Sequence, residues 1–127
     1  MNNVVVLAHD EGVVIDATAF RMLRNQLGEA GANTVVSRAM EEIASRLSLI
    51  ERSYYEDDRD ALWRAAESLS SSAEQVGAVS LTAASEAIAE CARVPDPVAL
   101  AAVVGRLLRL GDRSLSAVWD MPQSSTY

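Results

Sequence analysis

The side chains of this sequence that could act as nucleophiles, bases or metal ligands are few and far apart. The 127 residues include one histidine, His9, and one cysteine, Cys91. Zinc sites usually take three or four nitrogen or sulfur ligands, so we expect no metal and no cofactor. His9 beside Asp10 and Glu11 would allow a metal contact, but three polar residues in a turn more simply face water. Because no nucleophile–base pair and no glycine-rich phosphate loop is visible, we also expect no enzymatic activity.

A more informative group of polar and aromatic side chains lies between residues 58 and 76. Asp58 or Asp60 can cap a helix over residues 59–76 by accepting hydrogen bonds from its free backbone N–H groups. The apolar positions of this helix recur every three or four residues and so share one face; they are Leu62, Ala65, Ala66, Leu69, Ala73 and Val76. The opposite face carries Asp60, Trp63, Arg64, Glu67, Ser71 and Glu74. A large aromatic on a polar face is a candidate anchor for a protein partner, and partial cover of Trp63 by a neighbouring element is the alternative.

The stretch from residue 58 to residue 81 resembles the signature of histidine-containing phosphotransfer (HPt) domains, four-helix bundles that relay phosphoryl groups between receiver domains. The positions that match the family pattern are Ala66, Leu69, Ser72, Ala73, Gly77, Ala78 and Leu81. Glu67 replaces the phospho-accepting histidine of the pattern, and Ser70 and Ser71 replace its lysine and glycine. The chain is thus similar to an HPt domain that lacks its acceptor.

The missing histidine changes the function that the resemblance implies. A phosphohistidine relay needs an exposed imidazole nitrogen as nucleophile, which Glu67 does not supply, and the sequence contains no lysine to stabilise the transferring charge. The resemblance therefore implies a non-catalytic module that binds a receiver domain or a histidine kinase. The partner-binding residues that it implies are Trp63, Arg64, Glu67, Ser70, Ser71 and Glu74.

Simpler interpretations remain open for the same residues. Carboxylates and serines on a wet helix face most often serve only solubility, although Ser68, Ser70, Ser71 and Ser72 also allow phosphorylation or the close approach of another backbone. The alternative function is a structural or dimerising helical bundle with no role in a phosphorelay. A homodimer is compatible with either function.

Charge and hydropathy indicate which classes of partner to exclude. The chain carries 11 arginines against 18 carboxylates, a net charge of −7, and this balance argues against nucleic acid, which binds clustered cations. The longest apolar stretch, residues 98–104, is far shorter than the roughly 20 residues of a membrane-spanning helix. With one cysteine and no apolar leader, the expected location is the cytoplasm.

Apolar residues at helical spacing predict further helices on both sides of residues 59–76. Before them, a short helix capped by Asp16 ends at residues 28–31, and a longer one begins at Asn33 or Thr34. The apolar stripes of these two helices are Phe20, Leu23 and Leu27, then Val36, Met40, Ile43, Leu47, Ile50 and Tyr54. After them, one helix carries Leu81, Ala84, Ile88 and Cys91, and a last one starts at Asp96 and Pro97 and buries Leu100, Val103, Val104, Leu107 and Leu108. Gly111 either ends this last helix or only weakens it.

Each amphipathic helix must bury its apolar stripe against another helix. The predicted fold is therefore all-α, an antiparallel up-and-down four-helix bundle made of the four longer helices. Valine-rich runs at residues 4–7 and 13–15 allow a small β-hairpin, which would have to pack on the bundle or on a second copy of the chain. The predicted organisation is an N-terminal extension (1–15), a helical domain (16–120) and a polar tail (121–127).

Overall fold

The computed structural model describes residues 4–6 and 14–124 of the chain, with side-chain environments from residue 16 to residue 118. It contains four helices, α1 (Ala17–Tyr55), α2 (Arg59–Gln75), α3 (Val79–Ala92) and α4 (Pro97–Ser124). Two three-residue strands, β1 (Val4–Val6) and β2 (Val14–Asp16), precede them. The predicted all-α class is confirmed, and four helices of this kind are consistent with a four-helix bundle. The last helix extends to Ser124, so the expected polar tail from residue 121 begins as helix.

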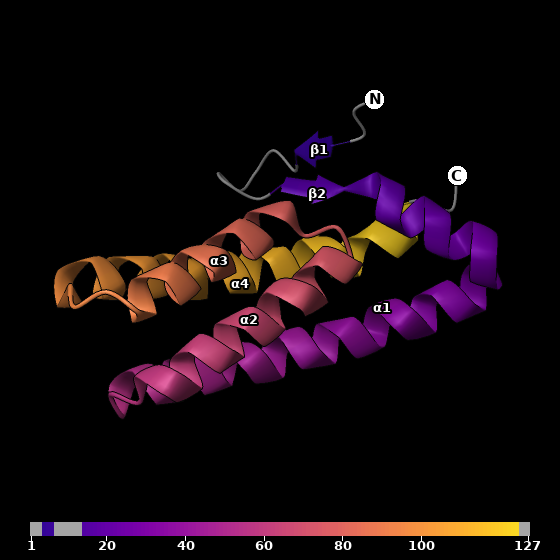
Figure 1. The fold of residues 1–127 in the computed structure, drawn as a ribbon. Coiled ribbons are helices and arrows are strands. Elements are labelled where there is room, and N and C mark those ends of the chain that lie inside the picture. The colour runs from indigo at the N-terminus through magenta and orange to yellow at the C-terminus, as the bar shows by residue number, and fades with distance from the viewer. Residues whose placement is uncertain (1–3, 7–13, 125–127) are drawn as a thin grey trace.

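The four helices enclose one core. α1 packs on α2, α2 on α3, α3 on α4, and α4 returns to α1 (Figure 1). The largest fully buried side chains come from all four helices and are Ile43, Ile50, Leu62, Leu69, Leu81, Ile88 and Leu107. The stripe predicted for residues 59–76 is buried at every position, which confirms that prediction. No helix among the described residues is both long enough and apolar enough to cross a membrane.

α1 is broken once, at Gly28, where φ is 77° and ψ is 175°. The predicted helix stop at residues 28–31 is thus confirmed at its first residue. The predicted new start at Asn33 or Thr34 is wrong, because helical backbone resumes directly after Gly28 and Thr34 Oγ donates to Ala30 O within the helix at 3.1 Å. Leu27, expected on the buried stripe, is half exposed because the helix changes direction at the next residue.

Aspartate caps begin three of the helical segments, as the sequence predicts. Asp16 Oδ1 accepts from Thr18 N at 2.9 Å, Asp58 Oδ1 from Ala61 N at 3.1 Å, and Asp96 Oδ1 from Ala99 N at 3.1 Å. Each bond satisfies a backbone donor that has no partner inside the helix. Gly111 lies inside continuous α4 helix and therefore does not end it.

Two hydrogen bonds between side chains fix the alignment of α1 against α2. Arg46 Nε donates to Ser68 Oγ at 2.7 Å, and Ser72 Oγ donates to Glu42 Oε1 at 3.0 Å. The residue number falls by four on α1 while it rises by four on α2, so the two helices run in opposite directions at this contact. These bonds turn Ser68 and Ser72 toward α1.

The turn between α2 and α3 is joined to the start of α1. Gly77 has φ 72°, and its carbonyl oxygen accepts a 2.7 Å hydrogen bond from Asp16 N. A Cβ at Gly77 would collide with the backbone oxygen of Asp16, so only glycine allows this approach without displacement. Asp16 also ends β2, which pairs antiparallel with β1 in the register Val4↔Asp16, Val5↔Ile15 and Val6↔Val14. The strands lie beside α3, near the start of α1 (Figure 1).

Candidate functional site: a groove between α2 and α3

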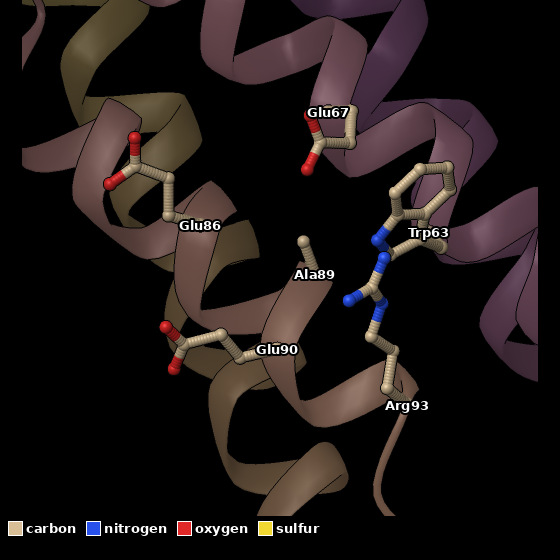
Figure 2. Close-up of a pocket in the computed structure, with 6 residues that line it drawn as sticks. All are labelled: Trp63, Glu67, Glu86, Ala89, Glu90 and Arg93. Atoms are coloured by element: carbon tan, nitrogen blue, oxygen red, sulfur yellow. The ribbon is translucent and has the colours of Figure 1, made fainter.

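An open groove of about 300 Å³ lies between α2 and α3. We call it the α2–α3 groove; its lining residues are Trp63, Glu67, Glu86, Ala89, Glu90 and Arg93. Figure 2 shows Trp63 and Glu67 on the α2 side and the other four on the α3 side. The groove therefore joins the predicted polar face of α2 to a second helix.

The α2 wall consists of two side chains one helical turn apart. Glu67 is exposed to solvent. Trp63 is half-buried and packs partly against the core, which holds the indole in place while it still borders the groove. A rigid, partly exposed aromatic ring is the kind of group that anchors a partner at low entropic cost.

The residues of the α3 wall are Glu86, Ala89, Glu90 and Arg93. They are spaced three or four positions apart along the helix, so they share one of its faces. Ala89 is a buried residue of the α3 wall, and its short side chain faces the space between the two helices (Figure 2). Glu86 and Glu90 are both exposed. The Arg93 guanidinium carbon lies 5.2 Å from the centroid of the Trp63 ring, within the range of a cation–π contact.

The end of α3 that carries Arg93 is tied to the start of α2. Arg59 donates from Nη1 to the carbonyl oxygen of Val94 at 2.9 Å and to that of Ala92 at 3.4 Å. Both carbonyls lie at the C-terminus of α3 or just beyond it, where a cation also interacts favourably with the helix dipole. Arg59 thus fixes the backbone from which Arg93 reaches Trp63.

The groove is electrostatically negative. Three carboxylates line it against one guanidinium. Within the described part of the chain, neither Glu67, Glu86 nor Glu90 forms an ion pair. The groove can therefore take a cation without first losing an internal salt bridge.

A second open cavity, of about 390 Å³, continues along α2 and α3 toward the Gly77 turn. Glu74, Glu86 and the 43% exposed Val79 are among its lining residues. Glu86 lines both cavities, so the two adjoin at this residue.

The six residues predicted to bind a partner do not all lie in these cavities. Trp63 and Glu67 line the α2–α3 groove, and Glu74 lines the second cavity. Arg64, Ser70 and Ser71 line neither; Arg64 and Ser71 are exposed, and Ser70 is half-buried. Ser68 and Ser72 are engaged with α1, which supports the interpretation that these serines let helices pack closely.

The α3 half of the groove was missed by sequence reasoning, which weighed only the polar face of residues 59–76. The available signal was the helical spacing of Glu86, Glu90 and Arg93 opposite the apolar stripe of α3. That spacing places the three side chains on one face, but it does not say which helix that face adjoins.

The other candidate groups lie away from the groove. Cys91, predicted to be buried, is half-buried, and it is a free thiol. His9, Asp10 and Glu11 lie outside the described residues. Within the described ranges, no three His, Cys, Asp or Glu side chains are placed to hold a metal ion.

Comparisons with known proteins add no relative. No family model, no curated protein and no solved structure matches this chain.

Proposed function

We propose that the chain is a cytoplasmic, non-catalytic module of phosphorelay signalling, an HPt-like bundle of the antiparallel up-and-down type without its acceptor histidine. It binds a receiver domain or a histidine kinase through the α2–α3 groove and the adjoining face of α2. Such a module competes with true phosphotransfer proteins for their partners or tunes the activity of those partners.

One observation carries the proposal. Glu67, at the position that matches the acceptor histidine, is exposed and lies one helical turn from Trp63 on the wall of an open groove. An acceptor histidine there would be accessible to a docked receiver, whereas a structural bundle has no need of access at this position. The tight turn at Gly77 and Ala78 and the close α1–α2 contact through Ser72 give further support, since these residues match the family pattern.

Restoring the acceptor tests the proposal directly. The variant Glu67→His, Ser70→Lys, Ser71→Gly has the acceptor, lysine and glycine of the family pattern. All three positions are at least partly accessible to solvent, so the fold should tolerate the changes. We expect this variant to accept phosphate from a phosphorylated receiver of the source organism as acid-labile phosphohistidine, whereas the wild-type chain remains unlabelled.

A matched control places the same chemistry on another helix. Glu51→His, Ser70→Lys, Ser71→Gly keeps the lysine and glycine but introduces the imidazole at an exposed position of α1, away from the groove. Labelling of the restored variant but not of this control would support specific docking at position 67. If no receiver of the source organism labels the restored variant, the signalling function is wrong and the structural alternative gains.

A further inference from the structure

We infer that the α2–α3 groove takes an arginine-bearing, cationic segment of its partner. The guanidinium of that segment would stack on Trp63 between the carboxylates of the two walls. This inference deepens the proposed function, because it names the chemistry by which the partner is recognised.

The charge of the groove gives the first argument. Glu67 stands on one wall and Glu86 and Glu90 on the other, all three exposed and none in an ion pair within the described residues. An anionic partner surface would be repelled here, whereas a cation placed between the walls can approach carboxylates from both helices. Electrostatic complementarity of this kind selects the partner and accelerates association.

The protein's own Arg93 gives the second, independent argument. Its guanidinium already lies over the Trp63 ring, 5.2 Å from the centroid. The face of the ring is therefore accessible to a guanidinium. Carboxylates alone would bind any cation, but a planar guanidinium can also stack on the indole, so the site favours arginine over lysine.

Arg93 can give way to an incoming arginine. It is exposed, and it follows the last residue of α3. Within the described part of the chain, its guanidinium interacts with the Trp63 ring and with no other side chain. Displacing it costs only one exposed cation–π contact, which the incoming guanidinium replaces. Removing Arg93 should therefore strengthen binding of an external arginine.

A hexa-arginine peptide is the probe, with binding to the full chain measured by calorimetry. At about 10 mM salt, where screening is weak, we expect saturable binding to the wild type. The groove variant Glu67→Gln, Glu86→Gln, Glu90→Gln should weaken binding by about tenfold or more, because close charge pairs at an interface carry large coupling energies.

The matched control removes the same charge elsewhere. Glu41→Gln, Glu51→Gln, Asp112→Asn neutralises three exposed carboxylates on α1 and α4, so that both triple variants have the same net charge. If the two triple variants lose affinity equally, the peptide senses net charge alone and the inference is wrong. Circular dichroism of each variant checks that it is folded.

Two single variants test the aromatic contact. Trp63→Leu should weaken the binding of hexa-arginine more than the binding of hexalysine. Arg93→Ala should strengthen the binding of hexa-arginine. Equal binding of the two peptides by the wild type, together with no effect of either substitution, would overturn the role of the ring.

A second copy of the chain is the competing occupant, because α4 carries the exposed Arg106 and Arg109. Sedimentation of the wild type without peptide distinguishes a second copy of the chain from an arginine-bearing partner segment as the occupant of the groove. Association at low salt that the groove variant abolishes would assign the groove to a second copy and overturn the inference; a monomer at all concentrations supports it.

Because none of these measurements uses a receiver, peptide binding can succeed where the restored variant stays unlabelled, and the two proposals fail independently.

Discussion

At the scale of single residues, the proposed function depends on position 67, where a glutamate allows partner binding but not phosphoryl transfer through histidine. A carboxylate cannot replace an imidazole as a phosphoryl acceptor in a histidine relay, yet it is solvated as easily and keeps the helix face open. Trp63, one turn away, is held by the core on one side and touched by Arg93 on the other. Under the proposed function, this site recognises a partner but does not accept phosphate.

Gly77 lines the second cavity, and its carbonyl oxygen joins the turn between α2 and α3 to the start of α1. Gly77→Ala should lower the free energy of unfolding by about 1–3 kcal/mol through its positive φ alone, and by more because its Cβ would push Asp16 away. Urea denaturation followed by circular dichroism measures the loss.

Gly28→Ala should also be destabilising, but for the backbone reason alone. A Cβ at Gly28 would meet nothing within 4 Å, whereas its φ of 77° with ψ of 175° is a conformation that is open almost only to glycine. An unchanged free energy of unfolding on Gly77→Ala would contradict both the backbone contribution and the close approach of Asp16.

At the scale of elements, small residues and polar pairs set how closely the helices pack. Ser68 and Ser72 bond to Arg46 and Glu42, and this fixes α2 on α1 with its other face turned outward. Gly111 is buried, and a Cβ there would meet both terminal methyls of Leu47 at less than 3 Å. A Cβ at residue 111 would therefore force the Leu47 side chain to shift at the contact between α4 and α1.

Two glycines of α4 allow a paired prediction. Gly105→Ala should raise the free energy of unfolding by about 1 kcal/mol, because alanine is the better helix former and its Cβ meets only the flexible end of Arg109. Gly111→Ala should instead lower it by about 1–3 kcal/mol, because Leu47 must shift within a packed core. Thermal unfolding of both variants checks the signs, and stabilisation by Gly111→Ala would contradict the close contact.

At the scale of the whole molecule, the four helices share one core and so should unfold together. Leu69 on α2 and Leu107 on α4 are both fully buried. Leu69→Ala and Leu107→Ala should each lower the free energy of unfolding by about 2–5 kcal/mol, and each variant should still unfold in one transition.

Coincidence of two probes tests this cooperativity. Far-UV circular dichroism and tryptophan fluorescence should report one midpoint in each variant. Val98→Ala, at a 79% exposed position, should change stability by less than about 0.5 kcal/mol. Separate midpoints for the two probes would show that part of the bundle unfolds independently.

The sequence by itself determined the order of the helices and most of the residues that they bury. The apolar stripe of residues 59–76, the caps at Asp16, Asp58 and Asp96 and the break at Gly28 all follow from local rules of spacing, capping and backbone freedom. At Asn33 and Thr34 the prediction was wrong, because residues that favour N-caps are also tolerated inside a helix at a modest cost in helix propensity.

Only the tertiary structure decided which faces meet. Periodicity places Glu67 on one face of α2 and Glu86, Glu90 and Arg93 on one face of α3, but it gives neither the rotation nor the alignment of one helix against another. Those depend on contacts between residues distant in sequence, such as the Arg59 bonds to the end of α3, the serine bonds to α1 and the approach of Asp16 to Gly77. The groove is formed by such contacts, and for this reason its α3 wall could not be read from the spacing of residues along the chain.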